Sequence, residues 1–262
     1  MKKTNNGKRF LSIPYLIFMF IFVLVPLVLI VIYAFSDGSH FSFTPLLNFV
    51  TSKQKWNVLL LSFVFGFLNT ILCLLIGYPL AYFLANKNVN KNAVLVMLFV
   101  MPMWINFVLR TWATRDVLTW IGLSGGRHPE LATIIGLVYN YLPFTILPLY
   151  TTMLKMDKSQ IEASYDLGAN PFKTFVKVII PLTMPGIISA SLMVFMPTMT
   201  SYVVSDILSE GKVTLFGKFI ALHFENNLWH DGSMLALIML IVIVLSLGVN
   251  KLLQRKHKVE AR

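Results

Sequence analysis

The side chains most often used in catalysis are scattered along this chain. Its five histidines show none of the paired spacings typical of metal ligands. They are His40, His128, His223, His230 and His257. The pairs Gly211-Lys212 and Gly217-Lys218 lack the second glycine and the hydroxyl of a phosphate-binding loop. No Gly-x-Ser-x-Gly elbow and no carboxylate pair spaced for acid–base work occurs either. We therefore expect a protein that is not an enzyme, with no cofactor and no metal site.

The elements that carry these residues are separated by long uncharged runs. Hydrophobic residues make up 56% of the 262 residues and charged residues 13%, against about a quarter charged in soluble domains. The runs approach or exceed the roughly 20 residues that a helix needs to cross a bilayer, and none alternates as a barrel strand would. They cover residues 10–36, 56–86, 92–109, 131–154, 178–205 and 232–250. The sequence predicts an all-α, polytopic membrane protein with six transmembrane helices, forming one domain over residues 1–262.

The first run could also be read as a secretory signal, because it follows a basic stretch. The apolar core of a signal peptide is usually about 7–15 residues long, and this run is longer. We expect an uncleaved first helix.

The six runs contain no ionisable Asp, Glu, Lys, Arg or His side chain. A carrier driven by an ion gradient usually places such groups within the membrane, so the energy for uphill transport would come from another subunit. Their polar neutral residues should face protein or a water-filled cavity, and are weak indications of a translocation face. The most notable are Asn69, Asn106, Asn140, Thr198, Thr200 and Ser201.

The net charge of +11 is distributed unequally between the segments that connect the runs. With the N-terminus inside, seven of the 22 Lys and Arg residues lie outside and 15 inside, as the positive-inside rule requires. The seven are Lys53, Lys55, Arg110, Arg115, Arg127, Lys212 and Lys218. In this topology all five tryptophans lie on the outer side, two at or near outer ends of runs and three in outer loops, which agrees with their preference for the headgroup region. We expect both termini in the cytoplasm, and the basic charge needs no nucleic-acid partner.

The longest cytoplasmic connection, residues 155–177, carries local helix signals. Ser159 with Glu162 forms a capping box, in which Ser159 starts the helix, and Gly168 can adopt the left-handed conformation that ends it. Asn170 before Pro171 predicts a second helix start. The segment is therefore expected to form two helices joined by an elbow.

Four hydrophobic side chains on this elbow would face the cytosol in isolation. They are Ile161, Leu167, Phe172 and Phe175. They could pack against the inner helix ends of the same chain, or form a preformed projection that fits a groove of a partner protein. The residues alone leave both possibilities open.

The same loop resembles the EAA loop of type I ABC-transporter permeases. The matching residues are Glu162-Ala163-Ser164, Gly168 and Val178-x-Ile180-Pro181, with Ser164, Val178 and Ile180 as conservative departures. The resemblance implies that the loop is a coupling helix docked on a separate ATPase subunit. It implies the following coupling residues: Glu162, Ala163, Ser164, Asp166, Leu167, Gly168 and Phe172.

Further segments between about residues 60 and 225 resemble the spermidine/putrescine permeases within that family. They include Met101-Pro102-x-Trp104, Leu142-Pro143-Phe144, Asp166-Leu167-Gly168-Ala169 and Tyr202-Val203-x-Ser205-Asp206. The resemblance implies polyamine import across a bacterial cell membrane, with two ATPase copies, a second permease and an external binding protein as partners. An ABC permease for sulfate, phosphate, iron or thiamine stays an alternative, as does a passive channel or a scaffold without transport.

A polyamine is a polycation, which needs carboxylates or aromatic faces along its path. Asp206 and Glu210 follow the fifth run, Tyr202 precedes Asp206 by one helical turn, and Trp104 lies near the outer end of the third run. We expect these four residues on the substrate pathway, with Asp206 and Tyr202 receiving the cation. The alternative is that Asp206 only ends a helix at the solvated surface.

Overall fold

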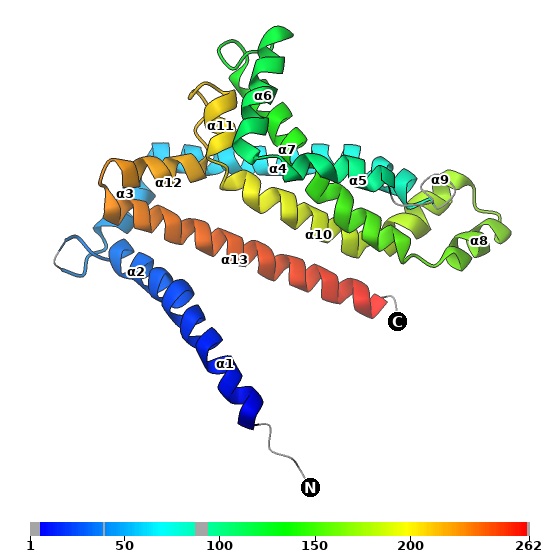
Figure 1. Ribbon diagram of the computed structural model, residues 1–262, viewed down its shortest axis with the longest axis horizontal. Coiled ribbons are helices and arrows are strands. Elements are labelled where there is room, and N and C mark those ends of the chain that lie inside the picture. Colours follow the sequence, from blue (N-terminus) through cyan, green and yellow to red (C-terminus); the bar gives the residue numbers. More distant parts are fainter. Residues whose placement is uncertain (1–5, 39, 87–93, 261–262) are drawn as a thin grey trace. The chain divides into compact units, whose positions relative to one another are not determined.

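The computed structural model describes residues 6–38, 40–86 and 94–260 (Figure 1). Within these ranges the chain is helical apart from turns and one isolated antiparallel bridge, between Ser36 and Phe41. Five helical stretches are long and apolar enough to cross a membrane, and a sharply bent pair of segments makes a sixth if it counts as one span. The five are Ile13–Ala34, Lys53–Ala85, Pro129–Leu154, Pro171–Met199 and Trp229–Gly248. The predicted all-α membrane fold is confirmed.

The chain folds as two compact units. The first comprises Met1–Trp56 with Ile220–Val244, and the second comprises Asn57–Phe219 with Leu245–Arg262. Three helices contribute residues to both units, and they are α4 (Lys53–Ala85), α12 (Phe216–Glu225) and α13 (Trp229–Glu260).

The first unit begins with a continuous helical stretch. It consists of α1 (Asn6–Met19), the π-helical turn η1 (Phe20–Leu24) and α2 (Val25–Ala34). Over residues 13–34 only Ala34 is buried in this chain. A helix that is apolar on all sides and exposed in its own chain is suited to lipid or to another membrane subunit.

Polar contacts join the rest of the first unit, which includes α3 (Thr44–Thr51) and the start of α13. Lys55 Nζ lies 3.2 Å from Asp231 Oδ2. His230 accepts a hydrogen bond from the Gly38 amide at Nε2, 3.2 Å, and its Nδ1 lies 3.2 Å from the Tyr33 carbonyl oxygen. Because Nε2 is the acceptor, Nδ1 must carry the proton and donate to Tyr33.

The second unit is centred on three long helices, namely α4, α7 (Pro129–Leu154) and α10 (Ile180–Met199). Small residues let them approach closely, as is common in membranes. A Cβ at Gly186 would lie 2.7 Å from Thr152 Oγ1, and one at Gly77 would lie 2.8 Å from Thr145 Cγ2. Asn69 Nδ2 donates to Thr198 Oγ1 over 2.7 Å, which satisfies two of the predicted inward-facing polar groups within the core.

The third run differs from the single span expected over residues 92–109, of which 92 and 93 lie outside the described residues. It forms three segments: α5 (Val94–Val100), the 3₁₀ turn η2 (Met101–Trp104) and α6 (Phe107–Trp120). The helix axis bends by 96° between Trp104 and Phe107. Ile105 is extended, and the Asn106 side chain accepts hydrogen bonds from the Val108 and Leu109 amides, so that Asn106 caps a new helix.

The fifth run also ends earlier than the expected residue 205. Helix α10 stops at Met199, and a turn leads to the short helix α11 (Val203–Leu208). In the second unit α11 packs beside α6 and the N-terminal part of α7 (Figure 1). This group of helices positions the acidic residues expected on the substrate pathway.

Candidate functional site: the coupling loop and the acidic helix

The loop expected to couple to a partner consists of two short helices, α8 (Lys158–Asp166) and α9 (Pro171–Thr174). The first helix begins with Asp157, whose Oδ1 accepts a hydrogen bond from the Ser159 amide over 3.0 Å. The prediction that Ser159 is the cap was therefore wrong by two positions. Asp and Ser both serve as N-caps. Asp157 is the earlier of the two, and the preceding helix α7 has already ended at Leu154, so the new helix can start there.

The elbow between the helices agrees with the sequence prediction. Gly168 has a φ of +78°, the left-handed conformation that glycine adopts without strain. The Ala169 amide donates to the Ser164 carbonyl over 3.0 Å and the Gly168 amide donates to the Tyr165 carbonyl over 2.9 Å. Asn170 Oδ1 accepts from the Lys173 amide over 2.8 Å, which confirms the second cap.

Two buried hydroxyl groups fix the angle of the elbow. Ser164 Oγ donates to the Ile161 carbonyl over 2.7 Å and lies 2.9 Å from Thr174 Oγ1. Since the single proton of Ser164 is engaged by Ile161, Thr174 donates to Ser164. Ser164, the departure from the Glu-Ala-Ala pattern, thus ties α8 to α9.

The four hydrophobic residues of the elbow divide into two groups. Phe175, the first residue of the π-helical turn η3 (Phe175–Ile179), packs its ring 5.7 Å from that of Tyr78 and 6.4 Å from that of Tyr82 on α4. Ile161 is half-buried. Leu167 and Phe172 are 88% and 76% exposed. The loop is braced on its own chain at one end and presents two apolar side chains outward at the other.

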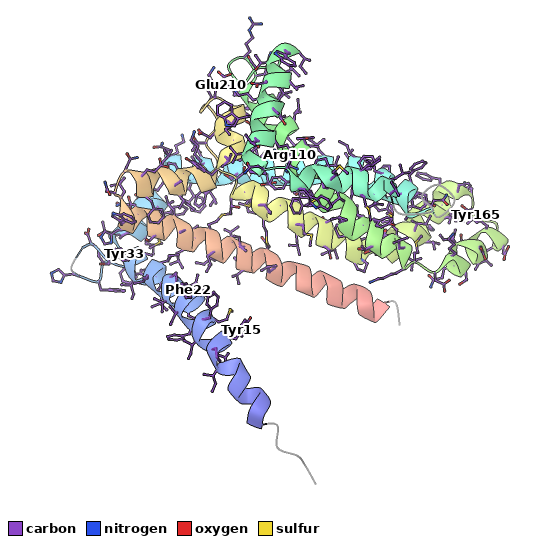
Figure 2. All side chains as sticks on the ribbon, viewed as in Figure 1. Tyr15, Phe22, Tyr33, Arg110, Tyr165 and Glu210 are labelled. Carbon is purple, nitrogen blue, oxygen red and sulfur yellow. The ribbon has the colours of Figure 1, made fainter. Side chains whose placement is uncertain are left out.

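Four of the other five proposed coupling residues are exposed, namely Glu162, Ala163, Asp166 and Gly168. Ser164 is buried, so its side chain supports the elbow and is not available to a partner. Tyr165, labelled in Figure 2, marks this end of the second unit.

Asp206, the expected cation-binding residue, lies on α11 and is paired with a lysine of the same chain. Lys218 Nζ, at the start of α12, donates to Asp206 Oδ1. The Lys218 side chain is 9% exposed and the Asp206 side chain 42%. The sequence reasoning did not pair these residues, because they are separated by the turn that joins α11 to α12.

Glu210 follows α11 with a φ of +51°. Its Oε1 lies 3.9 Å from Arg115 NH2 on α6. Figure 2 shows Glu210 at the far end of the α6–α11 group and Arg110 near the start of α6. Both expected acids are therefore next to basic side chains of this chain.

The two aromatic residues expected on the pathway occupy different elements. Tyr202 immediately precedes α11, is 40% exposed, and accepts a hydrogen bond from the Asp206 amide at its carbonyl over 3.1 Å. Trp104 ends η2 and is 84% exposed. The structure brings Tyr202, Asp206 and Glu210 together on one short segment and places Trp104 at the bend of the third span.

Arg110, to which the sequence assigned no role, is buried and has several partners. It is 6% exposed and donates from Nε to Asn140 Oδ1 over 2.8 Å and from NH1 to the Pro102 carbonyl over 2.9 Å. Its guanidinium carbon lies 5.6 Å from the centre of the Tyr139 ring. The sequence contains an indication of its importance, because a single arginine directly after an uncharged run is costly in a membrane and usually has a specific role.

Comparisons with known proteins identify the family of this chain. The family model described as binding-protein-dependent transport system inner membrane component matches residues 4–259. The spermidine/putrescine transport system permease protein PotB of Haemophilus influenzae is 36% identical, with 99% of this chain and 100% of the relative covered. PotB of Escherichia coli K12 is 33% identical, with 92% of this chain and 96% of the relative covered.

Two solved structures share the fold. A chain of a bacterial alginate ABC transporter, in complex with a pentasaccharide-bound periplasmic protein, aligns with a TM-score of 0.68 at 15% identity, covering 94% of this chain and 93% of that chain. A chain of the inward-facing MetNI methionine ABC transporter aligns with a TM-score of 0.55 at 18% identity, covering 77% and 93%. The present chain belongs to the family of inner-membrane components of binding-protein-dependent transport systems.

Proposed function

We propose that this chain is a permease subunit of an ATP-driven importer of polyamines such as spermidine and putrescine. The observation that carries the proposal is the similarity to PotB over almost the whole chain. The chain forms half of a translocation pathway and performs no catalysis of its own, and a separate subunit hydrolyses ATP.

The coupling surface is the α8–α9 loop. Leu167 and Phe172 are exposed apolar side chains on a rigidly capped element, which suits insertion into a groove of the ATPase. Glu162, Ala163 and Gly168 contribute the polar and close contacts around them. A movement of the ATPase then reaches α10 through η3, which follows α9 directly.

The complete importer contains this chain, a second similar permease, two ATPase copies and an external polyamine-binding protein. It resides in a bacterial cell membrane with both termini of this chain in the cytoplasm. The α8–α9 loop then faces the cytoplasmic ATPase, and α11 faces the side from which the polyamine is delivered.

The substrate pathway includes Trp104, Tyr202, Asp206 and Glu210. The acids supply negative charge and Tyr202 and Trp104 supply aromatic faces, which together can replace part of the hydration of an ammonium group. Their pairing with Lys218 and Arg115 keeps them neutralised when no substrate is present.

Reconstitution tests the proposed cargo. The chain would be purified with its neighbouring ATPase, second permease and binding protein, and ATP-dependent uptake of labelled spermidine, putrescine, sulfate and thiamine would be measured in the same vesicles. We expect uptake of the polyamines only. Sulfate or thiamine uptake without polyamine uptake would contradict the cargo, and uptake that needs no ATP would favour a passive channel.

Charge reversal in the loop tests the coupling. We expect Glu162→Lys to abolish uptake and release the ATPase, because a lysine would face the site that receives a carboxylate. Gln160→Lys, also exposed on α8, is the matched control and should retain uptake within about twofold, since isolated surface charges contribute little. Normal transport by Glu162→Lys would argue against the coupling role of this residue.

A further inference from the structure

The Lys218 ammonium occupies a site with two oxygen acceptors. It donates to Asp206 Oδ1, and the Gly211 carbonyl oxygen lies 3.5 Å away. The side chain is almost fully buried, with 9% of its surface exposed. A primary alkylammonium is thus held by a carboxylate and a backbone carbonyl.

The backbone around this site is fixed by close packing. A Cβ at Gly217 would lie 2.1 Å from the Thr200 carbonyl oxygen, so the start of α12 lies directly against the end of α10. The Phe216 amide donates to Ser62 Oγ over 2.7 Å, and Gly211 has a φ of +79°. The position of Lys218 relative to Asp206 is therefore determined by the fold and does not depend on a flexible loop.

Lysine carries its ammonium on a stem of four carbons. Putrescine is a chain of four carbons with an ammonium at each end, and spermidine has one end of the same kind. Resting on the proposed function, we infer that Lys218 is a built-in analogue of the polyamine: it occupies the Asp206 site when the transporter is empty, and the aminobutyl end of the substrate displaces it.

The accessible part of Asp206 provides the entry point for this exchange. Its side chain is 42% exposed, and within the described ranges only Oδ1 is bonded to a basic group. An incoming ammonium can contact Oδ2 before Lys218 leaves Oδ1. The Asp206 carboxylate then keeps a cationic partner throughout the exchange.

The exchange also predicts selection for primary amines. A primary ammonium has three N–H donors in a compact head, which suit a carboxylate and a carbonyl at once. A quaternary ammonium has no donor, so it cannot replace the two contacts of Lys218. Displacement of Lys218 is expected for putrescine and spermidine and not for tetramethylammonium.

Chemical rescue tests the site itself. Lys218→Ala would be introduced into the complete transporter in nanodiscs, and its thermal stability measured with added n-butylammonium, putrescine or tetramethylammonium. We expect the variant to melt at a lower temperature than the wild type, and the two primary amines, at millimolar concentration, to restore most of the loss. Equal effects of all three cations, or no effect of any, would overturn the inference.

Competition with the substrate is tested by binding. Labelled spermidine would be titrated onto the nanodisc complex without the binding protein, with Lys218→Met as a variant that keeps the packing of the stem. We expect affinity to rise by at least about tenfold, since a charge-assisted hydrogen bond of the competitor is removed. The double variant with Asp206→Asn should lose this gain, and Lys218→Arg should bind within about threefold of the wild type. Unchanged or weaker binding by Lys218→Met would overturn the competitor role.

Lys212→Met is the matched control, because Lys212 donates to the Gly126 carbonyl and not to an acid. It should leave spermidine affinity unchanged. The outcomes also separate the two proposals. If primary amines rescue Lys218→Ala but the wild-type complex does not import polyamines, the proposed cargo alone is contradicted. If the wild-type complex imports polyamines but Lys218→Ala is not rescued, the Lys218 inference alone is contradicted.

Discussion

At the scale of single residues, the geometry of the α8–α9 loop depends on a few short polar side chains. Asp157 starts the first helix, Asn170 starts the second, and the hydroxyls of Ser164 and Thr174 join them. Each satisfies a backbone or hydroxyl group that would otherwise lack a partner at a helix end. The exposed apolar residues between them are held in place by this polar framework.

Replacement of the caps separates the observed helix start from the one that the sequence predicted. We expect Asp157→Ala to destabilise α8 locally by about 1 kcal/mol, and amide hydrogen exchange in α8 to become roughly fivefold faster. Ser159→Ala should have little effect, because Asp157 provides the cap. Faster exchange in Ser159→Ala than in Asp157→Ala would contradict this assignment.

At the scale of elements, the bend of the third span is held by Arg110. Its two hydrogen bonds connect the turn before the bend, at Pro102, with the middle of α7, at Asn140. The acceptors are neutral oxygens, and the rings of Phe107 and Tyr139 lie within 6 Å of the guanidinium. A buried cation of this kind is tolerated where it stabilises a specific geometry.

Removal of Arg110 should therefore weaken the bent pair of segments. Arg110→Met would remove the donor to Asn140 Oδ1 and leave the Pro102 carbonyl with the Ile105 amide as its donor. We expect the purified complex to melt at least about 5 °C lower. Arg127→Met, which alters an exposed arginine, should shift the melting temperature by no more than about 1 °C. Similar melting temperatures of the two variants would show that Arg110 does not hold the bend.

The apolar end of the loop can be tested separately from its fold. Phe172 is 76% exposed, so Phe172→Asp should leave the melting temperature of the isolated permease pair unchanged while the ATPase no longer co-purifies. Gln160→Asp, exposed on the same loop, should retain the ATPase. Retention of the ATPase by Phe172→Asp would exclude this side chain from the interface.

The elements were predictable from sequence to different extents. Long uncharged runs predict membrane helices, because length and composition are sufficient for that inference. The break at Ile105 and Asn106 was not predictable from these criteria, since one polar cap within an apolar run does not change its length or charge. The Asp206–Lys218 pair spans a turn with left-handed residues Glu210 and Gly211, a conformation that helical spacing rules do not describe.

At the scale of the whole molecule, the expected orientation follows from the unequal distribution of lysine and arginine. It can be tested by cysteine labelling, because the single native cysteine, Cys73, is fully buried and can be replaced by alanine. In that background a membrane-impermeant maleimide should label His128→Cys in intact cells and Ser159→Cys only after permeabilisation. The reverse result would invert the topology.

The contact of Phe175 with Tyr78 and Tyr82 has a consequence for the direction in which force can pass. Aromatic rings in contact resist compression steeply, whereas the attraction between them is weak. A push on the α8–α9 loop is therefore carried directly to α4 through the ring contact as well as to α10. A pull opens the ring contact and reaches α4 indirectly through α10, whose Thr183 hydroxyl lies 2.8 Å from the Tyr78 hydroxyl. We therefore expect the ring contact to transmit a push from the loop directly to α4 and not to transmit a pull.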